Sequence, residues 1–193
     1  EKYIVYLDQN INHKDTSSRG IKINEQQQLK FFESLSKYLS YLKKLFNKDV
    51  IICLHPSSDY KKYKENLKNF KIIKYQTEKY INDAYLVLFH SSSSVMQAFF
   101  KKKRIINLKS LSMGKLNDAR RFLYLNKFNL LQKDIEEKKY EMNKGKLLKS
   151  LNKNTRNYFK ELKKKFFIEN RYNTVESLII EDIDNFFNLN TRS

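Results

Sequence analysis

Short apolar runs alternate with amphipathic segments over roughly the first 110 residues. An amphipathic helix is predicted over 25–46, where apolar residues recur at spacings of three and four: Leu29, Phe32, Leu35, Leu39, Leu42 and Phe46. Runs rich in β-branched and aromatic residues are typical of buried strands. Such runs occur at 2–8, 49–54, 71–75, 84–89 and 104–108.

The alternation of the two kinds of segment predicts the fold class. Shorter helices are expected at 58–69, 77–82 and 95–101, so a helix follows each of the first four runs. Strands that are apolar throughout and joined by helices imply a parallel sheet with right-handed crossovers. We therefore predict an α/β fold with a Rossmann-like sheet and helices on both faces. No glycine-rich fingerprint opens the first helix, which argues against a nicotinamide site.

The pattern changes beyond Ser110, where helical periodicity dominates. Helices are predicted at 115–127, 144–167 and 173–187. Residues 132–142 are ambiguous and allow a sixth short strand. With no repeat and no clear linker, we expect one domain over 1–193, with the sheet core at 1–110 and a mainly helical extension at 111–193.

The charge balance favours an anionic partner. Lys and Arg number 39 and Asp and Glu 21, for a formal net charge of +18. Nucleic acid, acidic lipid headgroups and phosphorylated substrates all fit such a charge. The lysines are spread along the whole chain, so the charge does not distinguish among these three classes of partner. No apolar run is long enough to predict a membrane span, and a first residue other than Met leads us to expect a piece of a longer protein.

Cys53 is the single cysteine and lies within an apolar run, so we expect a buried thiol and no intramolecular disulfide. This is consistent with a cytoplasmic protein. The three histidines and Cys53 lack zinc-ligand spacing, so no metal is expected. Neither a nucleophile elbow nor a phosphate-binding loop of the NTPase kind is present, and no cofactor is predicted.

Four consecutive serines, Ser91, Ser92, Ser93 and Ser94, follow the run at 84–89 and precede a predicted helix. Backbone N–H groups and the positive end of the helix dipole are available at such a junction, and hydroxyl groups add donors. The pattern predicts a phosphate site. Plain helix capping, which needs only one serine, is the alternative.

His55 and Pro56 end the second apolar run and are followed by Ser57. Pro56 restricts the preceding residue to an extended conformation, which projects the imidazole at the carboxyl edge of the sheet. There it can pair with a phosphate or donate one hydrogen bond. The alternative is a histidine that bonds a local carbonyl.

Further polar residues follow the predicted strands, where ligands bind in open parallel sheets. Possible ligand contacts there are Gln9, Arg19, Tyr75, Gln76 and His90. His90 is equally consistent with a buried structural role. His13 is expected to be a solvated loop residue.

The order of these motifs resembles the C-terminal, nucleotide-sugar-binding domain of GT-B-type glycosyltransferases of bacterial surface carbohydrates. It is most similar to the sialyl-, polysialyl- and Kdo transferases that use cytidine-activated donors. The resemblance covers about residues 1–110. It implies that His55 and Pro56, with Ser91 to Ser94, contact the donor phosphate, and that the substrate is a CMP- or CDP-linked sugar.

The resemblance also implies what this chain lacks. The general base of these enzymes is an acidic residue of the N-terminal domain, which is not in this sequence. We therefore name no catalytic residue and expect the chain to bind donor but catalyse little without an N-terminal GT-B domain or partner subunit. The implied acceptor is a surface polysaccharide or a lipid-linked glycan. A cytoplasmic location, with peripheral attachment at the inner face of the membrane as an option, is the corresponding expectation for the protein.

Two further functions fit the charge. A basic nucleic-acid-binding α/β module without enzymatic activity is the main alternative, because residues 144–165 are strongly basic. The aromatic residues of that segment fall mostly on its apolar stripe, which suggests core positions rather than stacking platforms and makes nucleic acid the less favoured partner. Docking of the same segment on an anionic membrane surface is compatible with the transferase hypothesis.

Overall fold

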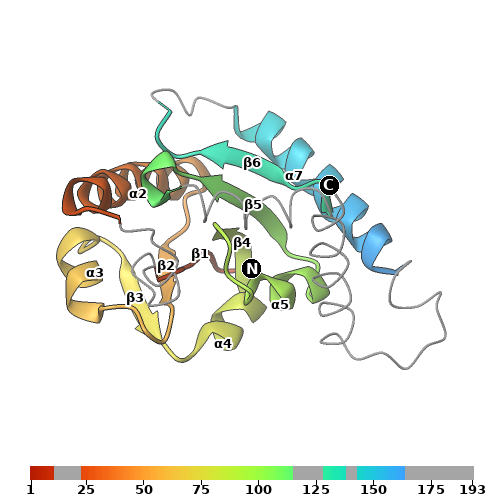
Figure 1. Ribbon diagram of the computed structural model, residues 1–193. Coiled ribbons are helices and arrows are strands. Elements are labelled where there is room, and N and C mark those ends of the chain that lie inside the picture. Colours follow the sequence, from red (N-terminus) through yellow and green to blue (C-terminus); the bar gives the residue numbers. More distant parts are fainter. Residues whose placement is uncertain (11–22, 115–127, 138–142, 164–193) are drawn as a thin grey trace, which may run out of the picture. The chain divides into compact units, whose positions relative to one another are not determined.

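The computed structural model describes residues 1–10, 23–114, 128–137 and 143–163 (Figure 1). Arg19, His13 and the helices expected at 115–127 and 173–187 lie outside these ranges. The chain divides into two compact units, residues 1–161 and 162–193. The expectation of one domain over 1–193 stays a prediction.

A six-stranded parallel sheet forms the centre of the first unit. Its strands are β1 (Tyr3–Leu7), β2 (Val50–Leu54), β3 (Lys71–Lys74), β4 (Ala84–Phe89), β5 (Arg104–Lys109) and β6 (Leu131–Asp134). The order β3-β2-β1-β4-β5-β6 is that of the Rossmann fold. The predicted fold class is thus confirmed.

Strand β6 extends the sheet to Asp134, beyond residue 110, where the sheet core is predicted to end. This strand overlaps the start of the segment 132–142, where the sequence allows a sixth short strand. It reads Leu-Gln-Lys-Asp and pairs only with β5, so it is an edge strand. Edge strands need less apolar surface than central ones, which is why the apolar pattern is weak there.

The helices are α2 (Glu25–Phe46), α3 (Tyr60–Asn66), α4 (Thr77–Asn82), α5 (Val95–Phe100) and α7 (Lys144–Lys163), with a short 3₁₀ turn, η1 (Leu111–Met113). Helix α2 begins at a capping box: the Asn24 side chain accepts from the Gln27 N–H (2.8 Å) and the Gln27 side chain accepts from the Asn24 N–H (2.9 Å). It ends at Asn47, which adopts a left-handed conformation.

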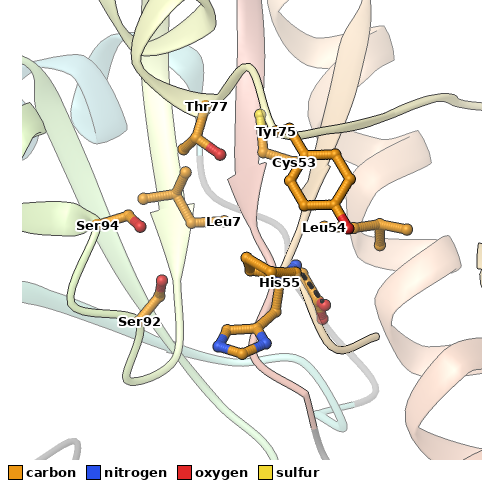
Figure 2. Close-up of a pocket in the computed structure, with 10 residues that line it drawn as sticks. Leu7, Cys53, Leu54, His55, Tyr75, Thr77, Ser92 and Ser94 are labelled. Atoms are coloured by element: carbon orange, nitrogen blue, oxygen red, sulfur yellow. Dashed lines mark hydrogen bonds between the residues drawn. The ribbon is translucent and has the colours of Figure 1, made fainter. Parts of the chain in front are cut away.

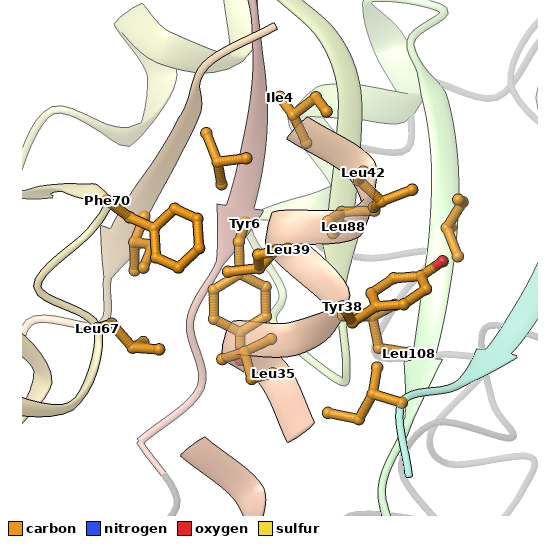
Figure 3. Packing of buried hydrophobic residues seen from close by; sticks show 14 of the residues in the cluster. Ile4, Tyr6, Leu35, Tyr38, Leu39, Leu42, Leu67, Phe70, Leu88 and Leu108 are labelled. Atoms are coloured by element: carbon orange, nitrogen blue, oxygen red, sulfur yellow. The ribbon is translucent and has the colours of Figure 1, made fainter. Parts of the chain in front are cut away.

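Helices cover both faces of the sheet. Ile4 and Tyr6 of β1 belong to the core cluster under α2, together with Leu35 and Leu39 (Figure 3). Because side chains alternate along a strand, the intervening residues of β1 point to the other face, where α4 contacts β1 and β4 and α5 contacts β4. Burial on both faces explains why the central strands are apolar throughout.

Helix α7 packs on the sheet unit through apolar residues of one side. Leu147 and Leu151 join the core cluster of α2. Tyr158 packs against Phe99 of α5 with ring centroids 4.9 Å apart, and its hydroxyl donates to the carbonyl of Lys103 (2.5 Å). Helix α7 thus lies within the helix predicted at 144–167.

The strand order places a crevice at a defined point of the sheet. The chain progresses from β1 outward to β3 on one side and from β4 outward to β6 on the other. Loops that leave β1 and β4 therefore diverge, and ligands of open α/β sheets bind where this happens, beyond the carboxyl ends of the strands.

Candidate anion-binding site

A small pocket lies at the carboxyl ends of the strands on both sides of this switch point (Figure 2). Its volume is about 110 Å³, and it is lined by Leu7, Asp8, Cys53, Leu54, His55, Pro56, Tyr75, Thr77, Ser92 and Ser94. The His-Pro turn after β2 and the serine turn after β4 thus share one cavity. A phosphate that binds both motifs requires them to lie this close together.

The turn after β2 holds the His55 ring by its Nδ1 atom. The Ser57 N–H donates to Nδ1 (3.2 Å), and the Ser57 hydroxyl lies 2.7 Å from the same atom. Asn10 in turn donates to the Ser57 carbonyl (3.1 Å) and hydroxyl (2.9 Å). A backbone N–H can only donate, so Nδ1 accepts and the neutral ring carries its proton on Nε2. His55 is thereby prepared to act as a donor through Nε2.

Asp8 anchors this turn from the end of β1. Its buried carboxyl accepts from the backbone N–H of His55 (3.1 Å), the hydroxyl of Ser58 (2.6 Å) and the hydroxyl of Tyr63 (2.5 Å). Burial raises the pKa of Asp8, while these hydrogen bonds and the nearby His55 oppose the rise without cancelling it.

The buried residue Asp8 is part of the lining of the candidate anion site. A carboxylate facing a phosphate would repel it. Here both carboxyl oxygens are occupied by donors from the turn after β2 and from α3, and the raised pKa reduces the tendency to ionise. Asp8 therefore acts as a structural acceptor that fixes the turn rather than as a solvent-accessible base.

The serine turn presents donors in a different way from that expected. The N–H groups of Val95, Met96 and Gln97 at the start of α5 bond to the carbonyls of the serine turn, at 3.2, 3.0 and 3.2 Å. Ser94 is the N-cap residue, and its side chain makes no capping hydrogen bond. The first helical amides are therefore already used within the turn, and hydroxyl capping does not explain the serines.

Ser92 and Ser94 are the two serines that line the pocket. No hydrogen bond among the described residues uses the N–H or hydroxyl group of either one. The hydroxyl of Ser91 donates to the side-chain oxygen of Gln9, and Ser93 is exposed outside the pocket lining. Ser92 and Ser94 therefore line the pocket with donor groups that the described residues do not use.

His90 lies outside the pocket lining, with its side chain only 2% exposed. Its Nδ1 atom lies 2.9 Å from the Leu108 carbonyl, and because a carbonyl only accepts, Nδ1 carries the proton. Asn107 donates to the His90 carbonyl (2.7 Å), and the ring packs against Tyr6 and Phe31. Of the two roles open in the sequence, these contacts favour the structural one.

The turn after β3 contributes Tyr75 and Thr77 to the pocket lining, whereas Gln76 is exposed outside it. Tyr75 has a φ of 65° and is 75% exposed, with Lys74 Nζ 5.6 Å from its ring centroid. Gln76 is the N-cap residue of α4, and Thr77 is the first residue of the helix itself. This leaves the Thr77 side chain for the pocket.

Sequence reasoning missed part of the site. Asp8 follows an apolar run, which is a usable signal, but its role depends on donors from distant segments. Tyr63 reaches Asp8 from α3, and no pattern in the sequence indicates this contact. Within the described ranges, no group of three or more His, Cys, Asp or Glu side chains is placed to hold a metal ion, and no helix is long and apolar enough to cross a membrane.

Comparisons with known proteins add several distant structural similarities. No family model matches the chain, and no curated protein matches it. Among solved structures, the glycosyltransferase SnogD from Streptomyces nogalater is similar at 8% identity with a TM-score of 0.48, over 83% of this chain and 39% of that one. UDP-GlcNAc 2-epimerase from Methanocaldococcus jannaschii, in complex with UDP-GlcNAc and UDP, is similar at 19% identity with a TM-score of 0.43, over 78% and 37%.

A third similar structure is Arabidopsis thaliana UGT89C1 complexed with UDP-L-rhamnose, at 14% identity with a TM-score of 0.38, over 80% of this chain and 34% of that one. The chain thus spans between 34% and 39% of the length of these three proteins. At these identities and TM-scores, the similarities do not establish an activity. The fold assignment rests on the strand order and connectivity of the chain itself.

Proposed function

We propose that this chain is the donor-binding half of a glycosyltransferase of the GT-B type. The observation that carries the proposal is the shared pocket, in which His55 and the two serines Ser92 and Ser94 meet at the β1/β4 switch point. Imidazole and hydroxyl donors around one cavity, at the sheet edge where nucleotides bind in such folds, suit a phosphate group.

The size of the pocket defines which part of the donor it accepts. Pockets for drug-sized ligands have volumes of about 300–1,000 Å³, whereas this pocket holds about 110 Å³. It therefore suits the phosphate of a nucleotide-sugar rather than the whole molecule. The exposed ring of Tyr75 beside it is available to the base, and the sugar would extend towards a partner domain or subunit.

In the proposed reaction, the site stabilises the leaving phosphate. Negative charge grows on that phosphate as the bond to the sugar breaks, and donors aimed at it lower the barrier. The Nε2–H of His55 and the hydroxyls of Ser92 and Ser94 supply these donors. Asp8 is buried and engaged with three donors, so it is not proposed as the base that activates the acceptor. The resemblance of the motifs places that base in an N-terminal domain or a partner subunit.

The finer features of the proposal follow from the resemblance of the motifs. The donor is a cytidine-activated sugar, CMP- or CDP-linked, and the acceptor is a surface polysaccharide, such as a capsule or lipopolysaccharide, or a lipid-linked glycan. Catalysis needs the N-terminal GT-B domain or a partner subunit, and no metal or cofactor takes part.

Titration calorimetry with CMP, CDP and UDP tests the proposal. One hydrogen bond to a charged group contributes about 1.5–3 kcal/mol, so His55→Ala should weaken nucleotide binding by about 10- to 150-fold. The double variant Ser92→Ala/Ser94→Ala should weaken it similarly. Ser40→Ala, at an exposed position of α2, is the matched control and should bind as the original chain does.

The pattern across ligands separates the parts of the proposal. Tighter binding of the two cytidine nucleotides than of UDP supports the cytidine donor. Equal binding of all three removes the cytidine preference but keeps the phosphate site. An affinity that His55→Ala leaves unchanged removes His55 from the site, and no binding of any nucleotide refutes the donor-binding function.

A further inference from the structure

The exposed side of α7 carries a line of positive charges, which we call the basic stripe: Lys146, Lys149, Lys153, Arg156 and Lys160. All five are exposed. At 3.6 residues per turn they fall within about 80° of arc, and at 1.5 Å per residue they extend over about 21 Å of the helix axis. The stripe is therefore a straight charged edge rather than charge spread around the helix.

Packing fixes the direction in which the stripe faces. Leu147, Leu151 and Tyr158 are each at most 2% exposed, and their positions on the helix lie opposite the stripe. Tyr158 is held further by its hydrogen bond to the Lys103 carbonyl. The helix cannot turn the stripe inward without exposing these residues.

The charge of the stripe is not balanced locally. Residues 144–160 contain no Asp or Glu, and among the described residues no carboxylate lies within ion-pair distance of the five cations. Like charges three and four residues apart destabilise a helix, and α7 has no acidic residue in its first turn. An anionic surface would relieve this repulsion.

The segment at the end of α5 contains an exposed aromatic ring and contacts α7 through a neighbouring lysine. Phe100, at the end of α5, is 44% exposed and is followed by the exposed residues Lys101 and Lys102. Lys102 Nζ lies 4.1 Å from the ring centroid of Phe159 on α7. Basic and aromatic side chains together are typical of helices that lie at a membrane interface.

We propose that the basic stripe docks the protein on an anionic phospholipid surface. Four to eight Lys or Arg residues on an amphipathic helix are the usual number for binding acidic lipid headgroups. A flat bilayer contacts all five positions of a straight stripe at once. Single-stranded nucleic acid needs rings for base stacking, but the aromatic residues of α7 are either buried, as Tyr158 is, or covered by a cation, as Phe159 is.

The test is flotation of the full chain with phosphatidylcholine vesicles that do or do not contain phosphatidylserine. Binding should require phosphatidylserine and fall as salt is added. The variant Lys149→Gln/Lys153→Gln/Arg156→Gln should lower vesicle partitioning by about 100-fold, because each cation near an anionic surface contributes roughly a factor of five. Circular dichroism of this surface variant verifies that the fold is retained.

A matched control removes the same charge elsewhere. Lys61→Gln/Lys64→Gln/Lys68→Gln changes three exposed lysines on and just after α3, and this variant should float as the original chain does. Equal losses in the two triple variants would show a general charge effect and overturn the proposal. So would an original chain that does not float with phosphatidylserine.

Two further measurements separate this proposal from other functions. If the original chain binds RNA or duplex DNA through the stripe while vesicle binding is insensitive to the stripe variant, nucleic acid is the partner and the proposal fails. CMP affinity should be the same in the stripe variant and the original chain, so failure of lipid docking is distinguishable from failure of the donor site.

Discussion

At the scale of single residues, the environments of three side chains around the pocket differ sharply. His55 is oriented by Ser57, Cys53 is sealed in the wall, and Tyr75 stands out at the rim. A positive φ costs a non-glycine residue of the order of 1–3 kcal/mol, and such strain concentrates at functional sites. Tyr75 has this conformation together with an exposed ring, which favours a role in ligand contact over a role in the core.

Tyr75→Ala should weaken CMP binding while leaving the binding of inorganic phosphate unchanged. Stacking of a base on an aromatic ring is worth about 1–3 kcal/mol, so we expect a loss of about 5- to 150-fold for the nucleotide. Calorimetry with the two ligands measures the difference, and Tyr75→Phe, which keeps the ring, is the control. A parallel loss for phosphate and CMP would contradict a base contact.

Cys53 should be unreactive until the protein unfolds. It is 2% exposed, and burial raises the pKa of its thiol to about 12. At pH 8 the thiolate fraction is then about 2,000-fold lower than that of a free cysteine with a pKa near 8.5. Reaction with an aromatic disulfide reagent should be slow in buffer and fast in denaturant; equal rates in the two would show that the wall beside His55 is open.

At the scale of elements, the turn after β2 is positioned by contacts from β1 and α3. Asp8 joins them by accepting from the His55 N–H, from Ser58 and from Tyr63. The turn that carries His55 thus depends on an acceptor 47 residues away in the chain. A substitution in α3 that removes the Tyr63 hydrogen bond should therefore affect the turn that carries His55.

Tyr63→Phe should destabilise the protein, and more at pH 7 than at pH 4. The variant removes a donor from buried Asp8, and an unmet buried polar group costs about 1–3 kcal/mol. Burial raises the pKa of Asp8 in the native protein. The contribution of this carboxyl group to the free energy of unfolding is therefore present at low pH and is lost as the pH rises through its native pKa. Loss of a hydrogen bond that lowers this pKa adds to the cost once the carboxyl ionises.

Urea unfolding at the two pH values measures this effect. Tyr60→Phe, at an exposed position of the same helix, serves as the control and should change the free energy of unfolding little at either pH. A Tyr63→Phe penalty that is the same at pH 7 and pH 4 would show that Asp8 does not ionise in the native protein.

At the scale of the whole molecule, the sequence indicated the fold class because strands that are buried on both faces consist almost entirely of apolar residues. The apolar runs that became β1, β2 and β4 could be recognised one by one, since each strand needs apolar residues whichever neighbours it has. The apolar pattern of β6 is weak because this strand lies at the edge of the sheet and pairs on one side only. The capping box at Asn24 also involves only neighbouring residues, but it is the two hydrogen bonds in the structure that establish it.

By itself, then, the sequence determined the parallel α/β architecture and named both motifs of the candidate site, because periodicity and strand-end position are properties of neighbouring residues. Tertiary structure decided which serines face the pocket, that Ser91 bonds Gln9, that His90 is buried, and that Asp8 and Tyr63 support the His55 turn. Those outcomes depend on the strand order that brings β1, β2 and β4 together. Contacts between segments tens of residues apart leave no periodic signal in a single chain.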